Sequence, residues 1–102
     1  APVQAEVFPI TDRHLEYARK VTARLEQAGV RVHLDDRKEK VNLKIREAQL
    51  QKVPYMLVVG DREAGTGAVS GRHRKHGDLG AKPLEEFLAG ITELIATKNN
   101  AE

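Results

Sequence analysis

Three side chains in the second half of the chain have the chemistry needed to recognise a nucleic-acid base: Glu63, Arg72 and Arg74. The planar guanidinium of arginine matches the acceptors of a base or a phosphate, and a carboxylate accepts from the N1–H and exocyclic amine of an unstacked guanine. Arg72 and Arg74 are two residues apart, so in a strand both would point to one face. Further basic residues precede them: Arg37, Lys38 and Lys52. The alternative interpretation is an ordinary solvated edge with a surface ion pair.

The basic charge is concentrated in the middle of the chain. The net charge is only +2, but residues 37–82 contain eleven basic and five acidic side chains, against five and six in residues 1–36 and one and four in residues 83–102. A basic block of this kind suits a polyanionic partner, although it also occurs as plain solvated surface. Because only 4% of the residues are aromatic, a base-stacking platform of the RNA-recognition-motif type is not supported.

The sequence gives little support to a metal site. His73 and His76 have a spacing seen in metal ligands, but no third ligand lies at a fixed local distance and the neighbouring cations oppose a divalent metal. We therefore predict no metal site and interpret the four histidines, at positions 14, 33, 73 and 76, as parts of a basic surface. The absence of cysteine excludes disulfides and thiolate ligands.

Motifs of catalysis are also missing. The sequence contains no nucleophile elbow, P-loop or dinucleotide fingerprint, and Gly65-Thr66-Gly67 is interpreted as a turn. One signalling alternative remains: Asp61 follows the apolar run Tyr55–Val59, as the phosphoacceptor follows a strand in a response-regulator receiver. That site also needs an acidic pair after the first strand and a lysine after the fifth, which the sequence does not supply. We predict no catalytic residue in this chain.

Hydrophobic periodicity places these residues on a regular framework. Apolar and polar alternation predicts strands, and three- or four-residue spacing of apolar side chains predicts helices. The predicted strands are 3–10, 30–34, 55–59, 68–74 and a short fifth at 77–81; the predicted helices begin near Thr11 or Asp12, at Asn42 and at Pro83. Residues 61–67 are predicted to form a glycine-rich loop. Gly29 is expected to stop the first helix.

This order predicts an α/β fold of three layers, α/β/α, around a mixed, mostly parallel five-stranded sheet. Right-handed crossovers make the first three strands parallel, and the short 61–67 loop makes strand 4 antiparallel. In the second helix, Lys44 and Lys52 are expected to reach solvent. Gly71 inside strand 4 is typical of a bulge or a close backbone approach.

The length of 102 residues predicts one domain, at 1–97, with a frayed tail at 98–102. A chain that begins inside a strand is expected to be a fragment of something longer. No apolar run approaches the ~20 residues of a membrane span, and the N-terminus has no signal-peptide pattern, so we expect a cytoplasmic setting without membrane contact.

Several stretches resemble the C-terminal anticodon-binding domain of threonyl-tRNA synthetase. The most specific is KIREAQLQKVPYMLVVGD at residues 44–61, while PIT and AGVRV are shared with class II synthetases for proline, histidine and glycine. The resemblance spans nearly the whole chain. It implies an α/β/α anticodon-binding fold and recognition of the middle G and third U of the threonine anticodon.

The resemblance also assigns roles to residues. The family's base-contacting positions fall on Glu63, Arg72, Lys52 and Lys38. Two of them differ from the family: Lys38 stands where asparagine is usual, and Lys52 where some members have arginine, whose bidentate contact a lysine cannot make. Phosphate or supporting contacts are expected from Arg37, Arg74 and Lys75.

For the parent protein the resemblance implies a threonine–tRNA ligase that uses ATP, magnesium and zinc, none of them bound by this domain. Threonine tRNA and the catalytic portion of the parent are the expected partners. The parent is expected to be a homodimer whose contacts lie largely elsewhere, which predicts a monomeric fragment. The alternatives are a similar domain of another class II synthetase, or of a synthetase-like accessory subunit.

Overall fold

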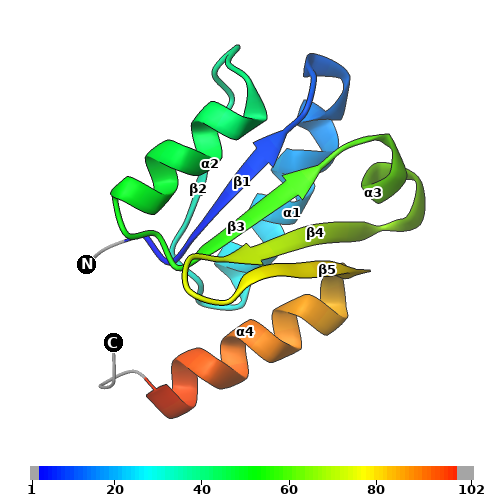
Figure 1. Cartoon of the computed structure of the whole chain (residues 1–102). Coiled ribbons are helices and arrows are strands. Elements are labelled where there is room, and N and C mark those ends of the chain that lie inside the picture. Colours follow the sequence, from blue (N-terminus) through cyan, green and yellow to red (C-terminus); the bar gives the residue numbers. More distant parts are fainter. Residues whose placement is uncertain (1–2, 99–102) are drawn as a thin grey trace.

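The computed structural model describes residues 3–98, and side chains up to residue 91. The elements in chain order are β1 (Ala5–Pro9), a 3-10 turn η1 (Asp12–His14), α1 (Leu15–Gln27), β2 (Val32–Leu34), α2 (Val41–Leu50), β3 (Tyr55–Val59), α3 (Asp61–Thr66), β4 (Ala68–His73), β5 (Gly77–Pro83) and α4 (Leu84–Lys98). Figure 1 shows their arrangement. The remainder of the predicted tail, 99–102, lies outside the described residues.

The five strands form one mixed sheet in the order β2-β1-β3-β4-β5. β1 pairs in parallel with β2 and β3, and β4 runs antiparallel to β3 and β5. The predicted fold class is therefore confirmed, including the antiparallel fourth strand. The half-buried pattern of residues 30–34 belongs to an edge strand, and the apolar run at 55–59 forms the central strand, which is covered on both faces.

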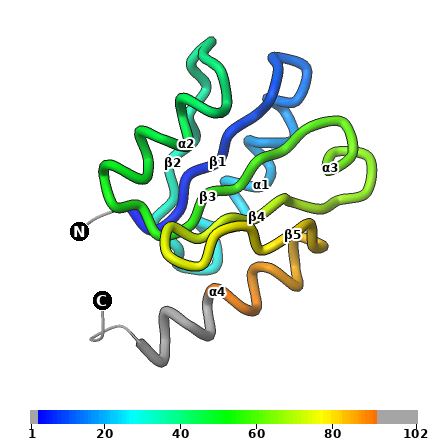
Figure 2. Tube along the Cα trace, viewed as in Figure 1, coloured from blue at the N-terminus to red at the C-terminus, as the bar shows by residue number. Residues whose placement is uncertain are grey.

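Helices pack on both faces of the sheet and give three layers. On one face, α1 and α4 enclose the larger core, which includes Val7, Leu25, Leu57 and Phe87. On the other face, α2 encloses a smaller core with Phe8, Ala48, Val53 and Met56. In Figures 1 and 2, α2 lies over the β1 side of the sheet, and β4 and β5 have no helix drawn in front of them. The structure thus leaves one face of β4 and β5 without a helix, within the residues it describes.

The second helix differs from its prediction in two ways. It begins at Val41 with Lys40 in the N-cap position, so Asn42 lies in the first turn rather than at the cap. Lys44 was expected in solvent but is only 2% exposed, and its Nζ donates to the backbone oxygen of Asp35 at 3.0 Å. The physical reason is helical spacing: Lys44 lies one turn before the buried Ala48 and so shares its face.

The segment at 61–67 is a short helix rather than a loop. α3 has Gly60 in its N-cap position and ends at Gly67, whose φ of 72° lies in the left-handed region that glycine adopts without strain. The two glycines therefore mark the ends of an element. At the next boundary, Pro83 is the last residue of β5, where it is paired with Ala68, and α4 begins at Leu84.

β4 alternates between the two faces of the sheet. Val69, Gly71 and His73 are buried on the side of α1 and α4, while Ser70 and Arg72 are half-buried on the opposite side. Gly71 has both features expected of it, because the pairing with β5 shifts register between Gly71 and Arg72, and the ring of Phe87 occupies the space that a Cβ at Gly71 would need. None of the helices within residues 3–98 combines the length and the hydrophobicity of a membrane span.

Candidate nucleic-acid interface

The uncovered face of β4 brings two of the predicted residues close together. Ser70 and Arg72 lie on this face, about 7 Å apart along the strand, and the Ser70 hydroxyl donates to Glu63 Oε2 at 3.0 Å. Arg72 is paired with Met56 of β3 on one side and Asp78 of β5 on the other. Glu63 and Arg72 therefore border the same strip of sheet, as the sequence analysis expected.

The Glu63 carboxylate is already bound within the protein. Only 8% of the residue is exposed, and its Oε1 accepts from the backbone N–H of Gly60 at 2.8 Å, which caps α3. Burial opposes ionisation, but the bonds from Gly60 and Ser70 outweigh it, and the pKa of Glu63 lies below its ordinary value. The side chain is thus a fixed anion. Since a carboxylate offers about four acceptor positions, it keeps capacity for a donor that reaches it.

Lys52 lies at the other end of the uncovered strip, beyond the end of α2. Val53 N donates to Ala48 O and Lys52 N to Gln49 O, each at 3.0 Å, which is the Schellman pattern. Lys52 occupies the left-handed position of that motif with φ of 64°, and it is the one non-glycine residue with positive φ in the described part of the chain. Gly29 has this position after α1, as predicted.

Two further basic residues lie near Lys52. β4 ends at His73, so Arg74 is the first residue of the following turn, one residue beyond the end of the strand. Arg74 N donates to Pro54 O at 3.0 Å, which places it at the same sheet edge as Lys52. Lys75 is exposed in the same turn. Basic residues therefore lie both before the start of β3 and after the end of β4, at the same end of the sheet.

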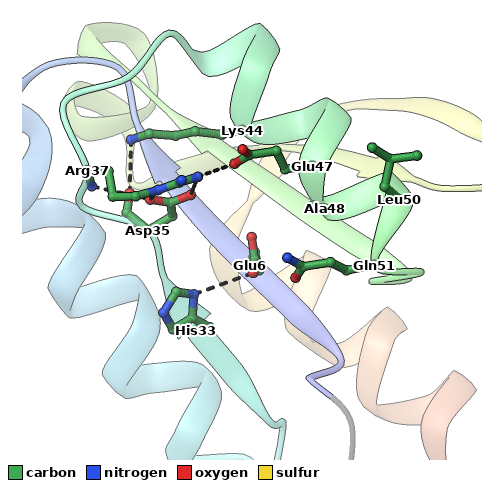
Figure 3. Close-up of a pocket in the computed structure, with 9 residues that line it drawn as sticks. All are labelled: Glu6, His33, Asp35, Arg37, Lys44, Glu47, Ala48, Leu50 and Gln51. Atoms are coloured by element: carbon green, nitrogen blue, oxygen red, sulfur yellow. Dashed lines mark hydrogen bonds and ion pairs between the residues drawn. The ribbon is translucent and has the colours of Figure 1, made fainter.

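Lys38 and Arg37 lie at the opposite edge, where β1 and β2 end. Lys38 is 85% exposed, with its Nζ 3.7 Å from Asp12. Arg37 is bound between two carboxylates: its Nε donates to Asp35 Oδ1 at 2.9 Å, and its Nη2 donates to Asp35 Oδ2 at 2.8 Å and to Glu47. Figure 3 shows Arg37 between these partners, beside a cavity of about 310 Å³. The bond from Arg37 holds the pKa of Asp35 below its ordinary value.

The predicted residues therefore lie at three places on the sheet. Lys38 lies where β1 and β2 end, Lys52, Arg74 and Lys75 lie at the opposite end, and Glu63 and Arg72 border the uncovered face of β4. Fixed hydrogen-bonding groups flanked by exposed cations can bind a polyanion and orient a base.

A comparison with family models identifies the domain. The family model described as the anticodon binding domain matches residues 4–94. The chain belongs to the anticodon-binding-domain family.

Among curated relatives, this anticodon-binding domain is similar to a threonine–tRNA ligase from Syntrophomonas wolfei, with 63% identity over 98 residues. The alignment covers 96% of this chain but 15% of the relative. The chain thus spans about one seventh of the length of the ligase that it matches.

Solved structures agree on the fold. The RNA-binding domain of threonyl-tRNA synthetase from Cryptosporidium parvum has a TM-score of 0.84 and 33% identity, covering 91% of this chain and 24% of that one. Prolyl-tRNA synthetase from the same organism has a TM-score of 0.85 and 27% identity, covering 99% and 22%. Family membership displaces the receiver-like alternative, and Asp61 is instead bound by His14 and Arg13.

The histidines of the anticodon-binding domain are not all on its surface. His14 and His73 are buried, with 4% and 9% exposed, so the prediction of a basic surface was wrong for both. His14 Nε2 lies 2.6 Å from Asp61 Oδ1, and His73 Nδ1 accepts from the backbone N–H groups of Lys75 and His76. The bond from His14 lowers the pKa of Asp61. Within the described residues, no group of three or more histidine, cysteine or acidic side chains is arranged to hold a metal ion.

Replacing Lys52 by glycine is expected to stabilise the domain by about 1 kcal/mol, because the left-handed backbone no longer opposes a side chain. Chemical denaturation measures this difference. Lys52→Ala is the matched control, since it removes the same charge but keeps the backbone strain. Equal stability of the two variants would show that the left-handed φ costs nothing here.

Proposed function

We propose that this chain is the anticodon-binding domain of a threonine–tRNA ligase and that it recognises the middle G and third U of the threonine anticodon. The observation that supports this best is the strip of uncovered sheet between Glu63, Arg72 and Lys52, since it combines fixed base-contacting groups with a basic rim. The similarity to threonine–tRNA ligases favours threonine over other amino acids.

The proposed contacts are of two kinds, contacts to bases and contacts to phosphates. Glu63 accepts from the N1–H and exocyclic amine of the middle guanine, and Arg72 donates to its acceptors. Lys38 and Lys52 approach the loop from opposite edges of the sheet. Arg74 and Lys75 bind phosphates and therefore contribute affinity rather than specificity.

In this proposal, the ligase reaction is carried out by the remainder of the parent protein. We infer that this domain binds no cofactor and that ATP, magnesium and zinc are bound in the parent's catalytic portion. The parent is a homodimer in this proposal, while the isolated domain is monomeric, and both function in the cytoplasm.

Direct binding to three tRNA transcripts tests the proposal. The first has the threonine anticodon, the second has its middle G replaced by C, and the third has its third base U replaced by G, as in proline anticodons. The threonine anticodon is expected to bind about tenfold or more tighter than either variant, as one good base contact discriminates by about 1–3 kcal/mol. Fluorescence anisotropy at fixed salt measures the three dissociation constants.

The third transcript also tests the main alternative, since the fold is shared with prolyl-tRNA synthetase. Tighter binding of the proline-type anticodon would assign the domain to a prolyl enzyme. Equal binding of all three would instead favour an accessory protein without anticodon recognition.

A further inference from the structure

The segment from Asp36 to Lys40 joins β2 to α2 and includes Lys38. The side chain of Lys38 makes few contacts. Its Nζ lies 3.7 Å from the exposed Asp12, and the side chain is 85% exposed. The position of Lys38 must therefore be determined by how the two ends of the segment are held.

Those ends are held by a polar network in which Asp35 and Lys44 are buried and Arg37 and Glu47 are partly exposed. Asp35, 5% exposed, accepts from Arg37 through the backbone N–H at 3.2 Å and through the guanidinium at 2.9 and 2.8 Å. Lys44 of α2 donates to the Asp35 backbone oxygen at 3.0 Å. The guanidinium of Arg37 also donates to Glu47, one turn further along α2. Figure 3 shows that these bonds connect the end of β2 to α2 across the base of the segment.

This arrangement makes Arg37 a poor ligand for phosphate. Its single positive charge faces two carboxylates, and its Nε and Nη2 already donate to them. With Lys44, the network of Asp35, Arg37, Lys44 and Glu47 carries no net charge when all four are ionised, so it offers a phosphate no excess of positive charge. The bonds to Asp35 and Glu47 also raise the pKa of Arg37 above its ordinary value.

We propose that Arg37 and Glu47 are positioning residues that hold Lys38 against the anticodon loop, in place of the phosphate contact expected of Arg37. The proposal rests on the proposed function of the domain. Breaking the bond between Arg37 and Glu47 would leave the cations of the surface intact but allow the segment with Lys38 to move relative to α2.

The variant Glu47→Gln separates the two roles of Arg37. It removes a negative charge, so electrostatics alone would strengthen binding to RNA. Positioning predicts the opposite: roughly a three- to tenfold weaker affinity for the threonine-anticodon transcript, which lies within the range of coupling between residues in contact. Glu39→Gln is the matched control, because it removes the same charge from an exposed site in the same segment and is expected to bind at least as tightly as wild type.

Coupling to Lys38 gives a readout that a merely structural role would not change. In a Lys38→Ala background, Glu47→Gln is expected to cause no further loss of affinity, since the residue it positions is absent. Arg37→Lys is expected to weaken binding although it keeps the charge. Circular dichroism and thermal unfolding of each variant confirm that it is folded.

The outcomes are distinct. If wild type prefers the threonine anticodon while Glu47→Gln binds as tightly as Glu39→Gln, the positioning role is wrong and the proposed function stands. Equal losses on Glu47→Gln with and without Lys38 would also overturn the positioning role. If wild type does not discriminate among anticodons, the proposed function itself fails.

Discussion

Alanine in place of Arg72 is expected to weaken binding of the threonine-anticodon transcript by about 1–3 kcal/mol, or roughly 5- to 150-fold, and to remove the preference for a middle G. The side chain is half-buried on the uncovered face of β4, two residues from the serine that binds Glu63. The strand fixes its backbone on both sides. Little backbone entropy is then lost when the guanidinium meets a base.

Lys75→Ala is the control for Arg72→Ala. Lys75 is exposed in the turn between β4 and β5, so its loss is expected to weaken all anticodons alike and to reduce the salt slope of binding by about 1. Titrations of the three transcripts at several salt concentrations measure both effects. If Arg72→Ala behaved as Lys75→Ala does, Arg72 would be a phosphate ligand, and another residue would have to make the base-specific contact.

Arg72 is a better test of recognition than Glu63, although both were expected to contact the same base. Each Glu63 oxygen already accepts a bond, one from Gly60 at the start of α3 and one from Ser70 on β4. Removing the carboxylate would leave a buried N–H without its partner, which costs about 1–3 kcal/mol of stability. A loss of RNA binding on mutation of Glu63 would therefore combine folding with recognition.

The sequence was most informative where one physical requirement dominates. The continuous apolar run at 55–59 and the helical spacing from Leu15 to Leu25 reflect burial, and Gly29 reflects a left-handed backbone that side chains disfavour. Gly71 was predicted to mark a bulge or a close approach, and both are present. These features follow from local pattern because each depends on the residue and its immediate neighbours.

The sequence was least informative where polar groups find distant partners. Lysine and arginine are normally exposed, so residue type argued against the burial of Lys44, which donates to Asp35, and gave no sign that Arg37 lies between Asp35 and Glu47. The helical face shared by Lys44 and Ala48 was the one available signal. The short α3 was missed because glycine-rich composition favours a turn, whereas its two terminal glycines cap a helix. The roles of the predicted base-contacting residues stay predictions.

Replacing Gly71 by alanine is expected to destabilise the domain by about 1–3 kcal/mol, the usual cost of overpacking a core. A Cβ at this position would lie 2.5 Å from Phe87 Cε2 and 3.2 Å from Cδ2, which is closer than carbon atoms pack. Phe87 is itself buried, with its ring edge-on to Tyr55 at 6.1 Å, so it has little room to move. Urea denaturation measures the loss.

Two comparisons separate steric crowding at Gly71 from the general effect of adding a methyl group. Gly90 lies within α4, where an added Cβ meets nothing within 4 Å, so Gly90→Ala is expected to stabilise by about 0.5–1 kcal/mol, the opposite sign. Phe87→Leu replaces the ring that the new Cβ would strike with a smaller side chain. The double variant with Gly71→Ala is therefore expected to lose less stability than the sum of the losses of the two single variants. Strict additivity would mean that Phe87 is not what excludes a side chain at Gly71.

The crowding at Gly71 is also expected to disturb the guanidinium of Arg72, because Arg72 follows directly at the register shift. Gly71→Ala should therefore lower discrimination at the middle base, while Gly90→Ala leaves it unchanged.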